Sequence, residues 1–372
     1  MNKFYLILFV FYLISCSKNE SEYLSLEPES PVVVDLKQVP YAKLSDYHFF
    51  EGDLKNQIPS LNVLPYEPAS SLFTDYALKK RFVWMPKSTK ATFIADDKVL
   101  DLPVGAVLIK TFYYNKIQPN NTTKILETRL MIKKSTGWIF ADYIWNDDQT
   151  EARFDLTGSY VNLDFKDDEN LSKSVTYRIP NESQCVVCHK NKKIIDGKLV
   201  TSFNPIGIKP QNLNFSIYYK GANQNQLKKW VAQGYLENNF LLPIQSKTTV
   251  NYKDVSKSLD ARARSYVDIN CAHCHQDERH CDYRPLRFAF NETGGSDGTT
   301  KMGACVDTRD MQSFPSYLNK IITPGNIETS MLFYRINTVD DSYRMPLHGR
   351  TLIDTQGVTL MKDWINSLER CN

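Results

Sequence analysis

The chain has 372 residues, of which 45 are basic and 42 acidic, so its formal net charge is +3. This balance, without a block of lysine or arginine, argues against nucleic acid as a partner and gives no sign of a strongly acidic one. Hydrophobic residues make up 42% of the chain, and the length is enough for two or three domains with a sizeable core.

Residues 1–15 predict an export signal. Lys3 supplies the charged start, and residues 4–13 form an uninterrupted apolar stretch that is too short to span a bilayer. This stretch runs into a Leu-Ile-Ser-Cys motif that ends at Cys16 and resembles the lipobox of bacterial lipoproteins. The resemblance implies that Cys16 becomes a lipid anchor and, because Ser17 follows, that the protein lies in the outer membrane, on the periplasmic face or the cell surface. The alternative is an ordinary signal peptide with a coincidental cysteine.

The next segments predict a tether and then a β-rich domain. Residues 16–40 are polar and contain prolines, which is typical of a flexible tether. Residues 41–210 predict a domain built on an antiparallel sheet, because segments such as 104–113 and 138–145 are rich in β-branched and aromatic side chains. A Ser-Thr-Gly turn just before residues 138–145 is a hairpin signal.

The rest of the chain predicts helices. Residues 211–254 are expected to form a helical linker region, with one helix from Ala222 to Gly234. Residues 255–372 are expected to form an all-α domain whose last helix, 355–368, carries an apolar stripe. The predicted fold class is therefore α+β and multidomain, with an antiparallel β-rich domain followed by an all-α domain.

Two five-residue runs match the C-x-x-C-H pattern of covalent haem c attachment. They are Cys185-Val-Val-Cys188-His189 and Cys271-Ala-His-Cys274-His275. Two thiols one helical turn apart can each add to a vinyl group of one porphyrin, and the histidine that follows is placed as an axial iron ligand. The sequence thus predicts two covalently bound haem c groups, with His189 and His275 as iron ligands.

Zinc is the alternative occupant of these cysteines, because two C-x-x-C pairs can form a ribbon site. Ribbon pairs are usually separated by about 15–20 residues, whereas Cys188 and Cys271 are much further apart in the chain. A zinc ribbon also does not require a histidine directly after each pair. The spacing therefore favours haem.

The C-terminal part of the chain resembles a class I cytochrome c domain. A helix runs into Cys271, the pair Met345-Pro346 lies between this motif and the last helix, and that helix carries Trp364. The resemblance implies that the first and last helices cross, with Tyr266 and Trp364 in contact, and that Met345 is the sixth ligand of a closed electron-transfer haem. His348 competes for this role and would give a lower potential.

The segment before the first motif resembles another group, the β-sheet haem proteins that include cytochrome c′-β. The resemblance rests on a Pro-x-Gly-x-x-x-x-Lys strand from Pro103 to Lys110, on Gly137-Trp138 and on the motif at Cys185. It implies an open, five-coordinate haem that binds nitric oxide or hydroxylamine. Lys110 matches a position that faces the haem in that group, and an exposed strand lysine is the alternative. Upstream candidates for a sixth ligand, each also compatible with a core or surface position, are His48, Met85 and Met131.

Most of the chain also resembles a family of uncharacterised exported bacterial dihaem c-type cytochromes. The residues that carry this resemblance are Pro65-Tyr66, 72–77, Arg81-Phe82, 103–105, 127–130, Trp145-Asn146 and the two haem motifs. It implies two haems and export, and it supplies no activity.

Three cysteines remain outside the haem motifs and the lipobox. Cys281 and Cys305 lie in one loop-rich stretch, and because export permits disulfides we expect these two to pair. The alternative is that all three are buried thiols, and Cys371 receives no role.

These features predict a dihaem c-type cytochrome lipoprotein that transfers electrons at the cell envelope, to a redox partner protein or a small-molecule redox substrate. The alternative is a haem enzyme or sensor whose open first haem acts on nitric oxide, hydroxylamine or peroxide while the second relays electrons. A dihaem peroxidase is disfavoured, because both its haem domains are helical and its chemistry needs a distal proton shuttle, whereas this chain has only 6 histidines. No catalytic residue is predicted.

Overall fold

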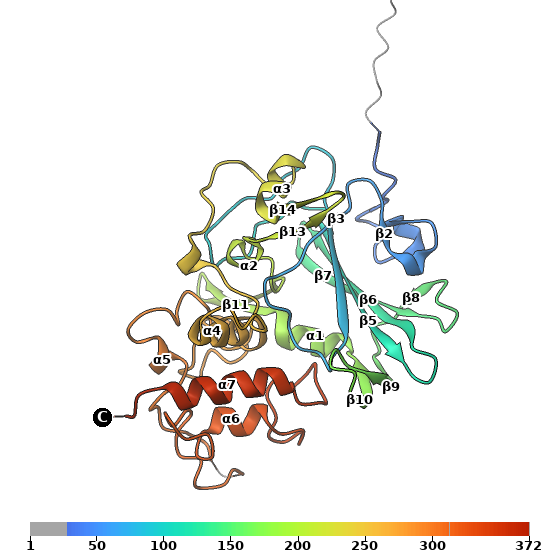
Figure 1. Cartoon of the computed structure of the whole chain (residues 1–372). Helices are drawn as coiled ribbons and strands as arrows, with labels where there is room; N and C mark the ends of the chain where they lie inside the picture. The colour runs from blue at the N-terminus through green and yellow to red at the C-terminus, as the bar shows by residue number, and fades with distance from the viewer. Residues whose placement is uncertain (1–27, 312, 372) are drawn as a thin grey trace, which may run out of the picture.

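A computed structural model describes residues 28–311 and 313–371. The predicted signal peptide and the predicted anchor Cys16 lie outside the described residues. The fold is mixed, with antiparallel sheets and few helices (Figure 1), which confirms the α+β prediction at this coarse level. None of the helices described is long and apolar enough to cross a membrane.

The strands are β1 (Phe50–Glu51), β2 (Ile58–Pro59), β3 (Leu64–Pro65), β4 (Leu78–Trp84), β5 (Val107–Ile117), β6 (Thr122–Lys134), β7 (Gly137–Trp145), β8 (Ala152–Phe154), β9 (Ser159–Lys166), β10 (Ser172–Ile179), β11 (Lys190–Ile195), β12 (Lys198–Phe203), β13 (Ser216–Tyr219) and β14 (Ala222–Asn225). The α-helices are α1 (Glu182–His189), α2 (Pro210–Leu213), α3 (Gln226–Ala232), α4 (Leu259–Asn270), α5 (Gly298–Lys301), α6 (Met331–Ile336) and α7 (Thr355–Ser367).

An eight-stranded antiparallel sheet forms the centre of the first half. Its main path runs β10-β9-β5-β6-β7-β8, while β4 pairs with β5 and β3 with β4. The predicted hairpin is present between β6 and β7, where Gly137 has a φ of 121° that favours glycine in the turn. The long strands β5 and β6 alternate between two buried faces, so each face packs against its own layer of chain.

One face of the sheet packs against the N-terminal segment. Ile109 and Leu130 share a buried cluster with Tyr47 and Val39, and the Val33 N–H donates to the Tyr47 carbonyl at 3.1 Å. The prediction of a flexible tether over residues 16–40 is therefore wrong for the described part of that segment. Its apolar residues bury area on the sheet, which composition alone did not indicate.

The other face packs against the segment predicted as a linker. Leu108 of β5 lies in one buried cluster with Leu227 and Trp230 of α3. The expected helix from Ala222 is wrong at its start, because residues 222–225 pair with β13 and α3 begins at Gln226. Asn225 explains the boundary, since its side chain caps the helix by accepting from the Lys228 N–H. The segment belongs to the first core and is no spacer.

The C-terminal segment carries α4, α6 and α7, which lie side by side at one end of the molecule (Figure 1). Ser258 and Asp354 cap α4 and α7 with their side chains. Gly357 lets α7 approach α4, because a Cβ there would collide with the Tyr266 ring. Trp364 shares the cluster with Tyr266, and its indole N–H donates to Asp260 at 3.3 Å.

The disulfide prediction is wrong. Cys305 pairs with Cys371, and Cys281 is a buried free thiol. The chain after α7 returns to the loop at Cys305, whereas the Cys281 N–H is bonded to the carbonyl of Cys274 beside the second motif. The pair therefore joins two segments that are 66 residues apart, and this gives Cys371 a role.

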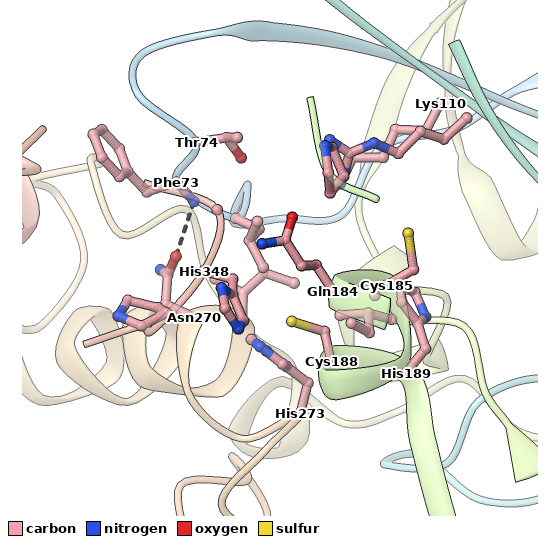
Figure 2. A pocket seen from close by; sticks show the side chains of 18 of the residues that line it. Phe73, Thr74, Lys110, Gln184, Cys185, Cys188, His189, Asn270, His273 and His348 are labelled. Carbon is pink, nitrogen blue, oxygen red and sulfur yellow. Dashed lines mark hydrogen bonds between the residues drawn. The ribbon is translucent and has the colours of Figure 1, made fainter. Parts of the chain in front are cut away.

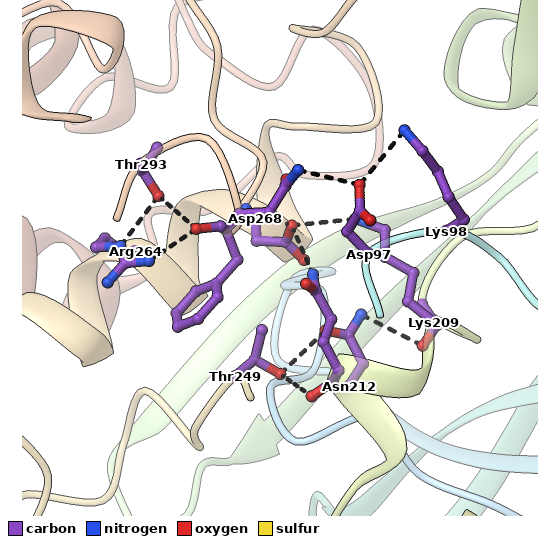
Figure 3. Close-up of polar contacts among 12 residues, drawn as sticks. Asp97, Lys98, Lys209, Asn212, Thr249, Arg264, Asp268 and Thr293 are labelled. Carbon is purple, nitrogen blue, oxygen red and sulfur yellow. Dashed lines mark hydrogen bonds and ion pairs between the residues drawn. The ribbon is translucent and has the colours of Figure 1, made fainter. Parts of the chain in front are cut away.

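A buried carboxylate joins the two halves (Figure 3). Asp268 of α4 accepts from the Lys209 ammonium at 3.0 Å, and it also accepts from the Phe290 N–H at 3.0 Å. Asn291 donates to Asp97 at 3.0 Å nearby. These contacts fix α4, which delivers the second motif, against the segment that covers the sheet.

Candidate functional site

The first motif lies on α1, directly after β10. Asn181 caps the helix by accepting from the Gln184 N–H at 3.2 Å, and the Gln184 side chain accepts in return from the Asn181 N–H. The helical turn brings Cys185 and Cys188 to one side of α1. Burial raises the pKa of Cys185 to about 11, so this thiol is protonated at neutral pH.

His189 is oriented by the backbone. Its Nδ1 lies 2.7 Å from the Asn204 carbonyl oxygen, which fixes the tautomer with the proton on Nδ1 and leaves Nε2 as a lone-pair donor. Burial lowers the pKa of His189 to about 4, and its ring packs 5.3 Å from the ring of Phe140. A neutral, oriented imidazole of this kind is what a haem iron requires. No pattern in the sequence indicated Asn204.

The second motif follows α4. The Cys274 and His275 N–H groups both bond back to the Cys271 carbonyl, at 3.1 and 3.0 Å, so the motif forms a helical turn. Burial raises the pKa of Cys271 to about 12 and lowers that of His275 to about 4. The His275 ring packs edge-on against Phe288 with 5.4 Å between the ring centres.

The two motifs meet. The sulfur atoms of Cys188 and Cys274 and a ring nitrogen of His273 all lie within 4.8 Å of one another. A hydrogen bond with Cys274 is the largest influence on Cys188 and holds the pKa of its thiol well below the usual value. Figure 2 shows Cys188 of α1 and His273 of the second motif pointing toward each other. His273 lies inside the second motif, and no pattern in the sequence indicated its contact with the first motif.

Each motif opens on a cleft, and the two clefts adjoin. The first has about 1650 Å³ of empty volume and the second about 940 Å³, part of it open to solvent. Residues that line both clefts are Cys188, Tyr266, Asn270, His273, Ile336, Met345, Pro346 and His348. The loop with Met345 and His348 thus forms a wall that both clefts share.

Asp75 holds this wall in place from the β-rich half. Its buried carboxylate accepts from the backbone N–H groups of Thr351 and Leu352, at 2.7 Å each, and from the Thr351 hydroxyl at 2.9 Å. The Arg350 guanidinium then donates to the Met345 carbonyl at 2.9 Å. Asp75 lies in the stretch 72–77 that carries the family resemblance, although its structural role was not predicted.

The other candidates for a ligand to the first site are now separated. His48 is exposed, and Met85 is buried in the core with 2% of its surface accessible. Met131 and Lys110 both line the first cleft. The alternative that Lys110 is an exposed strand lysine is therefore wrong, because its side chain is half-buried above Cys185 and Gln184 (Figure 2).

The residues present fit two haem c groups. Each motif offers two sulfurs from one helical turn and a half-buried neutral histidine at the edge of a cleft, and His189 has the backbone partner that a ligating imidazole needs. Cys188, His273 and Cys274 also form a donor set that suits zinc. The chain matches no protein-family model, no curated protein and no solved structure.

Proposed function

We propose that this chain is a dihaem c-type cytochrome that transfers electrons at the cell envelope. The observation that carries the proposal is the meeting of the two motifs, whose clefts share one wall. Two redox groups held on either side of that wall would exchange electrons rapidly, because the electron-transfer rate falls steeply with the distance between donor and acceptor. In this proposal Cys185 and Cys188 hold one haem, and Cys271 and Cys274 hold the other.

The chain's own residues have distinct parts in this function. His189 and His275 would act as neutral axial ligands, and the Asn204 carbonyl would keep His189 in the required tautomer. Met345 would give the second haem a thioether ligand, which stabilises ferrous iron and raises the potential. Haem c would supply the reversible one-electron chemistry when bound.

The C-terminal region, in this proposal, is an all-α domain similar to class I cytochrome c. The packing of α4 on α7, with Tyr266 beside Gly357 and Trp364 bonded to Asp260, supports it. The order of motif, Met345 and last helix gives further support. A closed, six-coordinate second haem would pass single electrons and bind no substrate.

We also propose that the protein is exported and anchored in the outer membrane through an acylated Cys16. The disulfide between Cys305 and Cys371 supports export, because disulfides persist in oxidising compartments. The acceptor or donor would be a redox partner protein or a small redox-active molecule that approaches at the membrane surface.

The test is to count haems on exported protein. A pyridine haemochrome assay should give two haems per chain, and mass spectrometry should find both attached covalently. The variant Cys185→Ala/Cys188→Ala should retain one haem, and so should Cys271→Ala/Cys274→Ala. Colourless protein with one zinc per chain, lost on His273→Ala, would replace this proposal with a structural metal site.

A second candidate function is a haem enzyme or sensor with an open first site. It is favoured by the larger volume of the first cleft, which extends beyond the motif over the sheet to Lys110 and Arg129. A high-spin ferric signal that disappears on cyanide or nitric oxide binding would support it. Two low-spin signals that neither ligand changes would exclude it.

A further inference from the structure

The sheet face that lines the first cleft carries an ordered row of charged side chains. Across β4, β5, β6 and β7, the residues directly opposite one another are Arg81, Lys110, Arg129 and Asp142. The neighbouring row on the same face is apolar and consists of Val83, Leu108, Met131 and Phe140. All four residues of the charged row line the first cleft. We call Arg81, Lys110 and Arg129 the cation row.

The cation row lowers the stability of the sheet when no anion is bound to it. Like charges on directly opposite residues of neighbouring strands repel, and partial burial makes the repulsion stronger. Arg81 is 8% exposed. Burial, followed by the charge of Arg81, lowers the pKa of Lys110 well below its usual value. A row of this kind persists when a negative group offsets its charge.

Carboxylates of the protein neutralise the positive charge of the cation row only in part. Arg129 forms a double hydrogen bond with Glu127, and its Nε lies 3.8 Å from an Asp142 oxygen. Arg81 donates to the Ser71 hydroxyl at 3.0 Å, and within the described ranges neither Arg81 nor Lys110 has a carboxylate within 4.0 Å. Two of the three cations therefore face the cleft without an anionic partner.

We propose that the cation row binds an anionic oxygen group, a carboxylate or a small oxyanion, inside the first cleft. Guanidinium groups and an ammonium in a line match two or three such oxygens with charge-assisted hydrogen bonds. The anion has two candidate sources, and for one of them this proposal rests on the proposed haem function. The anion is a propionate of the haem held at Cys185 and Cys188, or it is a small oxyanion that enters from solvent.

The position of the row fits both sources. Phe140, which packs against the His189 ring, belongs to the adjacent apolar row and is two residues from Asp142 on β7. An anion bound by Lys110 would therefore lie one row away from Phe140, whose ring packs at a tilt against the proposed axial ligand His189. Figure 2 shows Lys110 and Gln184 extending into the same space.

The test compares two lysine variants of the holoprotein. Lys110→Met removes one charge from the cation row and keeps the length of the side chain. Lys80→Met is the matched control, because Lys80 precedes Arg81 on β4, points to the opposite face and donates to the Asn56 carbonyl. Lys110→Arg keeps the charge and should retain the behaviour of the native protein. Haem content and thermal unfolding are measured first on every variant.

Calorimetric titration with nitrite tests the free oxyanion. Nitrite should bind the native protein, bind Lys110→Met about tenfold more weakly through the loss of one charge-assisted hydrogen bond, and bind Lys80→Met unchanged. Potentiometry tests the propionate. In that case nitrite does not bind, and the potential of the first haem falls in Lys110→Met alone, because the lost positive charge had favoured the reduced state.

The proposal is overturned when Lys110→Met matches Lys80→Met in both nitrite affinity and potential. Failure of the proposed function is recognised separately, because haem-free protein fails the haem count before either measurement. In haem-free protein, nitrite binding that weakens in Lys110→Met still supports the cation row, and absence of binding overturns it.

Discussion

The two clefts differ in how their walls are built, although each begins at the same five-residue motif. The first cleft rests on a rigid sheet, and the basic residues that line it are Arg81, Lys110, Arg129, Arg178 and Arg350. The second lies among helices and loops, and apolar residues dominate its lining, among them Leu286, Phe288, Ile321, Met331 and Leu332. Burying a cation without a negative partner costs free energy, so the basic lining of the first cleft favours a bound anion. The apolar lining of the second cleft favours a redox group shielded from solvent.

The difference extends to how each region is held together. Strand pairing holds the sheet beside the first cleft, whereas the C-terminal region is cross-linked by the Cys305–Cys371 disulfide. The loop of residues 345–352, which we call the wall loop, is held by Asp75. The regions nevertheless share Asp75, Asp268 and the meeting of the two motifs. The following substitutions separate what belongs to each region from what they share.

The largest effect on stability is expected from Cys371→Ser. Loss of a cross-link between residues 66 apart should lower the free energy of unfolding by about 4 kcal/mol through the entropy of the unfolded chain. In the proposed dihaem protein, loss of the disulfide should change the signals of the second haem first during urea unfolding. Cys281→Ala should keep the bond, and peptide mapping without reductant should recover a linked pair containing Cys305 and Cys371. A Cys281–Cys305 peptide would contradict the structure.

Asp75→Ala should cost about 3 kcal/mol, because it leaves the buried N–H groups of Thr351 and Leu352 without an acceptor. Since the wall loop carries Met345 and His348, both haem spectra should change if the loop is shared by the two sites. Asp148→Ala is the control, as Asp148 is exposed. A change confined to the second haem would show that the wall serves that region alone.

The sequence predicted the structure best where interactions between neighbouring residues determine it. The motif spacing and the turn before Gly137 depend on neighbouring residues, so the sequence alone indicated them. The Asn204 partner of His189 and the Asp75 contacts join residues distant in the chain, for which periodicity carries no signal.

The wrong predictions have the same origin. Residues 222–225 were expected to begin a helix, yet they pair with β13 as β14, and Asn225 caps α3, which begins at Gln226. Proximity in sequence suggested Cys281 for Cys305, whereas the return of the chain after α7 decides the pairing. The sequence did not indicate the cation row, because its members come from three separate strands.

In the proposed dihaem protein, Met345→Ala should leave both haems attached and change the second one. Without the thioether its sixth site should open to cyanide and its potential should fall, since the soft sulfur favours ferrous iron. His348→Ala is the matched variant in the same loop, and it should leave the second haem low-spin. An unchanged spectrum in Met345→Ala, with an opened site in His348→Ala, would assign the ligand to His348.

The smallest effect concerns the acidic end of the charged row. Burial raises the pKa of Asp142 well above its usual value, and the neighbouring Glu127 carboxylate raises it further. The folded protein therefore keeps a proton that the unfolded chain releases as the pH rises above 3.8, so this group lowers the free energy of unfolding with increasing pH. An asparagine does not titrate and cannot impose this cost.

Asp142→Asn should therefore match the native protein in stability near pH 4 and exceed it at pH 8, by roughly 1 kcal/mol, the usual size of a single buried change. Urea unfolding across this range measures the difference, with Asp148→Asn as the exposed control. A gap that stays constant with pH would mean that Asp142 is ionised in the folded protein. The cation row would then already hold a full negative charge at its end, and the contrast between the two clefts would be correspondingly smaller.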